Sequence, residues 1–133
     1  MENLLDIGVE EFQIAGGGVL RFHPGDPNLF ARFLRAEEDI QALEKSLSQT
    51  AQEGKEMLSL MEETDAKIKG ILNGVFGGDN DFHKALNGVN LLAVDSNGVS
   101  LATRLFGALE KVLTEGANRF AKQQAEKLIV DNG

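Results

Sequence analysis

The sequence predicts a mainly α-helical protein with a small N-terminal β-hairpin, an α+β fold built around a helical bundle. Two long stretches carry apolar residues at every third or fourth position, which is the spacing of one face of a helix. Ahead of them, two short runs with partial alternation flank a glycine-rich link, a pattern typical of a hairpin. The chain has 133 residues, and folded domains most often have about 100 to 150. We therefore expect a single domain over residues 1–133.

The composition narrows the classes of function. Apolar residues make up 42% of the chain and all eight aromatic residues are phenylalanine, so the core should be largely aliphatic. Cysteine is absent, which excludes disulfides, thiolate catalysis and cysteine-based zinc sites. The net charge of −8 disfavours nucleic acid, since Lys and Arg must neutralise its phosphates.

The first residues do not look like a targeting segment. Residues 1–12 carry acidic side chains where a secretion signal needs basic ones, and they lack a long apolar stretch. The longest apolar patch, residues 89–94, is interrupted by Asn90 and is far too short to cross a bilayer. We expect a soluble cytoplasmic protein with no membrane partner.

Residues 1–23 should form the hairpin, with strands over residues 9–14 and 19–22. A lone hairpin is only marginally stable in water, so it must pack on a helix or pair with another chain. The glycines at 16–18 do not make a dinucleotide loop, because G-x-G-x-x-G would need glycine where Arg21 stands. The candidates for its buried face are Phe12, Ile14, Leu20 and Phe22.

Residues 26–75 should be helical and acidic. Asp26 can accept hydrogen bonds from first-turn amides, and Pro27 suits the first helical position, so a helix begins here. From residue 40 to residue 75 the apolar and small residues are three or four apart, which predicts one long central helix with a seam that could form a dimer. Gly54 costs about 1 kcal/mol relative to Ala inside a helix. It marks a bend, a close helix crossing or a break, and the sequence leaves these alternatives open.

Charges are spread unevenly along the chain. Residues 37–69 hold nine acids and four bases, whereas residues 101–133 hold four acids and five bases. These segments could lie side by side with little repulsion. Within the acidic segment, Glu63 precedes Lys67 and Asp65 precedes Lys69 by four residues. Each pair should support the helix by about 0.2 to 0.5 kcal/mol.

Residues 76–99 are expected to form glycine-rich turns around a short helix. The tripeptide Asn-Gly-Val occurs at 73–75, 87–89 and 97–99, and Asn-Gly is favoured where the backbone needs positive φ. About two helical turns fit between residues 81 and 86. Ser100 should cap a long C-terminal helix over residues 100–129.

The stretch 74–88 contains Asp79, Asp81 and His83, which could be read as metal ligands. Counted from Asp79, however, an EF-hand would need glycine where Lys84 stands and glutamate where Asn90 stands. Glycines that end one helix and an aspartate that caps the next account for the stretch without a ligand. We therefore predict no catalytic, cofactor-binding or metal-binding residues and no enzyme activity. A metal-dependent hydrolase using these three residues is the remote alternative.

Several segments together resemble a known family. They are the N-terminal hairpin, residues 22–33 (FHPGDPNLFARF), the acidic helix, the Phe-Gly-Gly break at 76–78 and residues 105–109 (LFGAL). In this layout the chain resembles the tail assembly chaperone-like proteins of long-tailed phages and prophages of Gram-positive bacteria. The resemblance implies a non-enzymatic role in the bacterial cytoplasm: binding the helical tape measure protein and handing over to the tail tube protein.

A chaperone of this kind needs adaptable apolar side chains on its surface, and Met and Leu can repack against varied partners. The same residues could simply be core, and the sequence leaves both readings open. The hairpin could also offer a strand edge to a second copy. The alternative function is therefore a self-associating helical structural or adaptor protein. The candidate partner-binding residues are Leu47, Met57, Leu58, Leu60, Met61, Phe12 and Phe22.

Overall fold

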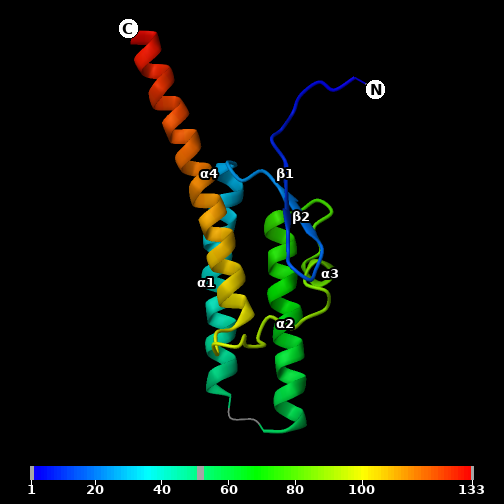
Figure 1. Cartoon of the computed structure of the whole chain (residues 1–133). Coiled ribbons are helices and arrows are strands. Elements are labelled where there is room, and N and C mark those ends of the chain that lie inside the picture. Colours follow the sequence, from blue (N-terminus) through cyan, green and yellow to red (C-terminus); the bar gives the residue numbers. More distant parts are fainter. Residues whose placement is uncertain (1, 51–52, 133) are drawn as a thin grey trace.

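The structure, a computed structural model, describes residues 2–50 and 53–132. It is mainly helical with an N-terminal hairpin, which confirms the predicted fold class (Figure 1). The hairpin consists of β1 (Glu10–Gln13) and β2 (Val19–Phe22), paired in antiparallel register with Phe12 opposite Leu20. The helices are α1 (Pro27–Gln49), α2 (Lys55–Phe76), the short α3 (Phe82–Ala85) and α4 (Leu101–Asn132).

The expected long central helix is in fact two helices. α1 ends at Gln49, and α2 begins at Lys55 after Gly54, whose φ of 62° favours glycine. The chain reverses between them, so α1 and α2 lie side by side as a helical hairpin (Figure 1). The regular spacing of apolar residues that predicted one helix is present in both helices, but the apolar faces of α1 and α2 pack against each other. Periodicity cannot separate these cases, because a fold-back preserves the spacing on both sides of the turn.

The core lies between α1, α2 and the first half of α4. Phe33 and Ile40 of α1 pack with Ile68 and Leu72 of α2, and Leu113 of α4 completes the cluster. All five side chains are at most 1% exposed. Complete burial of such a side chain contributes roughly 1.5 to 3 kcal/mol, so these contacts hold the three helices together.

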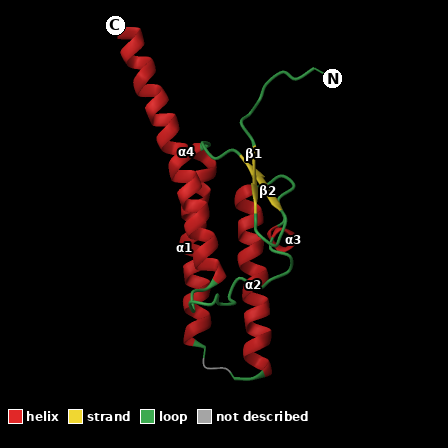
Figure 2. Ribbon diagram, in the orientation of Figure 1, coloured by secondary structure: helices red, strands yellow, loops and turns green. Residues whose placement is uncertain are grey.

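The β-hairpin packs against α2 and α3, as Figure 2 shows. Phe12 stacks on Phe22 with ring centroids 4.5 Å apart, and Phe22 meets Phe76 of α2 edge-on. Gly18 donates its N–H to the carbonyl of Ala85 at 2.8 Å. A Cβ at Gly17 would lie only 2.1 Å from that same oxygen. Glycine is therefore needed there because two backbones meet.

α4 starts beside the middle of the helical hairpin and runs along α1 toward the other end of the molecule (Figure 1). Its final turns continue past the first turn of α1. Among the described residues, no helix is both long enough and apolar enough to cross a membrane.

Candidate partner-binding surface

The helical hairpin is shaped by its helix ends. The Asp26 side chain accepts from the N–H of Asn28, and Pro27 occupies the first turn of α1, as the sequence predicted. At the other end, the Thr50 hydroxyl donates to the carbonyl of Ser46 at 2.9 Å. These contacts satisfy backbone and side-chain groups at the two ends of α1.

Most of the predicted partner-binding residues gather at the turn end of this hairpin. We call Leu47, Met57, Leu58, Leu60 and Met61 the distal surface. Leu58 is 67% exposed. The other four are half-buried, and Leu47, Met57 and Met61 continue the seam along which α1 and α2 face each other, so Leu58 is the most accessible of the five. The core cluster reaches Leu43 on α1 and Ile68 on α2, so the distal surface lies beyond it. In Figure 1 this end of the hairpin also extends past the start of α4.

The two phenylalanines proposed for partner binding lie elsewhere. Phe22 is 4% exposed and belongs to the core, so in this fold its ring is not accessible to a partner. Phe12 is half-buried and covers Phe22. These two side chains attach the β-hairpin to α2, and we do not include them in the distal surface.

The three candidate metal ligands have separate structural roles. Asp81 caps α3, its Oδ1 accepting from the N–H of Lys84 at 3.2 Å. His83 has its Nδ1 2.9 Å from Nζ of Lys69, and Asp79 is exposed. No group of three acidic, histidine or cysteine side chains suited to a metal ion occurs within residues 2–50 and 53–132. The geometry thus supports the helix-end interpretation of this stretch.

A buried ion pair fixes the loop that follows α3. Nζ of Lys69 lies 2.8 Å from Oδ2 of Asp65, and it donates to the carbonyl of Val89 at 2.8 Å. Nζ of Lys69 also lies 2.9 Å from Nδ1 of His83, which accepts from the ammonium in the tautomer that carries its ring proton on Nε2. Oδ1 of Asp65 in turn accepts from the N–H of Leu91 at 2.8 Å.

The sequence did not reveal this ion pair as a tertiary contact. Asp65 and Lys69 have the same four-residue spacing as Glu63 and Lys67, yet the first pair is 8% and 4% exposed and the second 63% and 59%. The only hint was the position of Asp65 and Lys69 beside core residue Ile68. An i,i+4 pattern carries no information on whether another segment covers it.

An acidic contact lies between α1 and α4. Burial raises the pKa of the Glu37 carboxyl, and the Glu110 carboxylate raises that pKa further. Oε1 of Glu37 is buried and accepts no hydrogen bond from any described residue. Burial also raises the pKa of the Glu44 carboxyl, about two helical turns further along α1. Both glutamates line a cleft of about 310 Å³ between the two helices. The contact therefore opposes close packing of α4 on α1 at neutral pH.

Fold and surface together define a small helical-bundle protein with a β-hairpin on one side and an apolar patch at one end. Comparison with protein-family models, with curated proteins and with solved structures found no match for this chain.

Proposed function

We propose that this protein is a non-enzymatic phage tail morphogenesis protein, similar to a tail assembly chaperone, that binds helical segments of a tape measure protein. The proposal rests on the resemblance described above and on one structural observation. The helical hairpin carries apolar side chains beyond the core, at an end that α4 does not cover. A third helix laid there would extend the packing that α4 makes further along the hairpin.

The chemistry of the distal surface suits such a partner. Two of its five residues are methionines, whose flexible thioethers adapt to differently shaped neighbours. Four exposed glutamates and two exposed lysines flank it in the sequence, a net negative surrounding: Glu53, Glu56, Glu62, Glu63, Lys45 and Lys55. An amphipathic helix with apolar anchors and flanking Lys or Arg residues would match both features. In this proposal the protein acts in the bacterial cytoplasm, keeps the tape measure protein soluble and passes it to the tail tube protein.

The test is co-expression with the tape measure protein from the same genome, with the soluble fraction of that protein as the readout. Leu58→Glu should abolish the solubilising effect. The side chain is 67% exposed, so the substitution should leave the fold intact. Leu34→Glu is the matched control, because Leu34 is 47% exposed on α1 outside the distal surface. Equal solubilisation by both variants would contradict the proposal.

A self-associating structural or adaptor protein is the second candidate, favoured by α4. This helix continues beyond the bundle with Phe120 51% exposed. Sedimentation velocity separates the two functions. A monomer that still solubilises the tape measure protein supports the chaperone, whereas a stable oligomer without that activity supports the adaptor.

A further inference from the structure

A groove lies at the end of the molecule opposite the distal surface. It runs between the turn at residues 23–27, which leads into α1, and the segment of α4 that contains Gly116 and Phe120. Its larger lobe has a volume of about 450 Å³ and its smaller lobe about 170 Å³. The two lobes share the turn and Phe120, so they adjoin each other.

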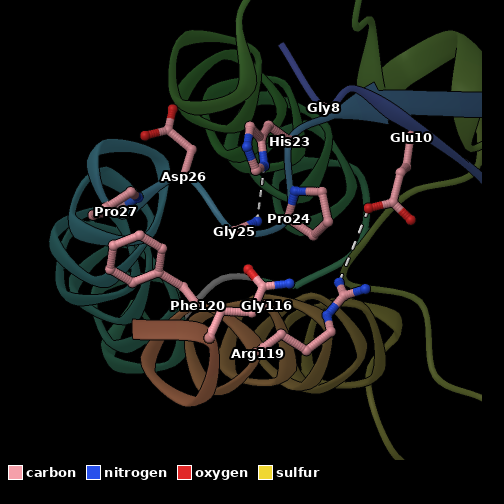
Figure 3. A pocket seen from close by; sticks show the side chains of 11 residues that line it. Gly8, Glu10, His23, Pro24, Gly25, Asp26, Pro27, Gly116, Arg119 and Phe120 are labelled. Carbon is pink, nitrogen blue, oxygen red and sulfur yellow. Dashed lines mark hydrogen bonds and ion pairs between the residues drawn. The ribbon is translucent and has the colours of Figure 1, made fainter. Parts of the chain in front are cut away.

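The two lobes differ in character. The smaller lobe is walled by apolar side chains from both helices: Phe30, Leu113, Ala117 and Phe120. The larger lobe adds polar groups. Figure 3 shows His23 on one side and Arg119 on the other, with Arg119 directed toward Glu10. Nη2 of Arg119 lies 3.9 Å from Oε2 of Glu10. Glu10 and Asp26 also line the groove, so its smaller lobe suits an apolar side chain and its polar rim favours neither sign of charge.

The N-terminal segment starts at the rim of this groove. Gly8 lines the larger lobe, near His23 in Figure 3. Residues 2–7 beyond it extend away from the body (Figure 1). Leu4 is 100% exposed, Leu5 76% and Ile7 63%. Three large apolar side chains therefore lie in water on a segment that is attached at the larger lobe, and the apolar smaller lobe lies further along the groove.

Gly8 joins this segment to the groove wall. Its φ is 80°, a value that favours glycine, and its N–H donates to Oδ1 of Asp6 at 2.8 Å. A Cβ at Gly8 would lie 2.9 Å from Nε2 of His23. Glycine is therefore favoured at this joint by both its backbone conformation and its close contact with His23.

Charge also favours contact between the segment and α4. Residues 2–7 contain Glu2 and Asp6 and no base. Residues 119–127 of α4 contain three bases and one acid. In ordinary salt, opposite charges attract one another over distances of about 10 Å. Leu4 is four residues from Gly8 and can therefore reach about 13 Å from it at roughly 3.3 Å per residue, into a groove whose larger lobe Gly8 borders.

We propose that residues 2–7 form a strap that folds back at Gly8 and closes over the groove, placing Leu4 or Leu5 in the smaller lobe. The closed strap covers Phe120 and ties the N-terminus to the point where α4 leaves the bundle. A partner that uses this end of the molecule must first displace the strap, which makes it an autoinhibitory element. The inference does not depend on the proposed function.

The lack of cysteine in the chain allows a direct test by disulfide trapping. Leu4→Cys and Leu5→Cys are each combined with Ala117→Cys and equilibrated with glutathione. The effective concentration of the two thiols is then measured by mass spectrometry. A short flexible tether gives effective concentrations in the millimolar range. We expect at least a tenfold higher value for one of the pairs, because a closed strap holds the thiols together.

Effective concentrations of millimolar or less for both pairs would overturn the proposal. Disulfides between two chains in place of the internal one would overturn it too, since a second copy would then be the occupant. Leu5→Cys with Leu58→Cys is the control pair, because Leu58 lies at the opposite end of the bundle.

A second measurement uses the chain without engineered thiols. Leu4→Ser with Leu5→Ser should lower the melting temperature by several degrees, because a closed strap buries one of these side chains. Leu58→Ser, at a residue that is 67% exposed, is the control and should leave the melting temperature unchanged. Identical melting temperatures for the wild type and the double variant would refute the strap.

Discussion

The buried ion pair between Asp65 and Lys69 gives the sharpest prediction on stability. The substitution is Asp65→Asn, which keeps the shape of the side chain and an oxygen that can accept from Leu91 N–H. It removes the negative charge that lies 2.8 Å from the Lys69 ammonium. The ammonium would then be left with the Val89 carbonyl and the His83 ring as its acceptors.

The expected loss follows from the burial of the pair. The two side chains are 8% and 4% exposed, so water cannot replace the lost carboxylate. Removing one partner of a buried ion pair costs about 3 to 5 kcal/mol. Domains of this size have a free energy of unfolding of about 5 to 15 kcal/mol. We therefore expect Asp65→Asn to remove a large part of the stability of the protein.

The assay is urea unfolding followed by helical circular dichroism, with the free energy of unfolding extrapolated to water. Glu63→Gln is the matched control, because its pair with Lys67 has the same spacing and is exposed. That control should lose no more than about 0.5 kcal/mol. A loss of less than about 1 kcal/mol for Asp65→Asn would refute the reasoning, since the pair would then behave like a surface pair.

A double variant separates the charge from the packing. Asp65→Leu with Lys69→Met removes both charges and keeps apolar volume at the site. Buried pairs replaced in this way are often neutral or gain stability, so the double variant should be more stable than Asp65→Asn alone. The Leu91 N–H loses its acceptor, and this cost, about 1 to 3 kcal/mol, limits the recovery. A double variant less stable than Asp65→Asn would show that the fold depends on the carboxylate contact to Leu91 more than on charge pairing.

Two further predictions concern the packing of α4. A Cβ at Gly116 would lie 2.2 Å from the carbonyl oxygen of Pro24, so Gly116→Ala should lose about 1 to 3 kcal/mol of unfolding free energy. A Cβ at Gly107 on the same helix would meet nothing within 4 Å, so Gly107→Ala should gain up to about 1 kcal/mol of unfolding free energy. Urea unfolding measures both changes. Equal effects of the two substitutions would contradict the close contact at Gly116. Burial, and then the Glu110 carboxylate, raises the pKa of Glu37 in the folded state. The protonated carboxyl therefore contributes stability below pH 4.5, its ordinary pKa. That contribution is lost as the pH rises through the folded-state pKa. Glu37→Gln should thus stabilise the protein at pH 7 by at most about 1 kcal/mol, since the pair is partly screened, and should make stability less dependent on pH; a variant less stable than the wild type at pH 7 would contradict this.

Elements that depend on local chemistry could be predicted from the residues themselves. The Asp26-Pro27 start of α1 appears as predicted, since capping involves only neighbouring residues. The hairpin around the glycines at 16–18 and the helix after Ser100 were predictable for the same reason. The Asp81 cap also follows from its position at the start of a short helix. In each case the deciding contacts span four residues or fewer, or one tight turn.

The coverage of these local elements by other parts of the chain could not be predicted, because it depends on tertiary packing. Tertiary packing turned one expected helix into two that face each other, and it buried Asp65 with Lys69 while leaving Glu63 with Lys67 in water. It also placed Phe22 in the core and left Leu58 exposed. The physical reason is that burial depends on segments distant in the sequence. Helical periodicity shows which residues share a face, but the packing of the other helices and the hairpin decides whether that face meets protein or water.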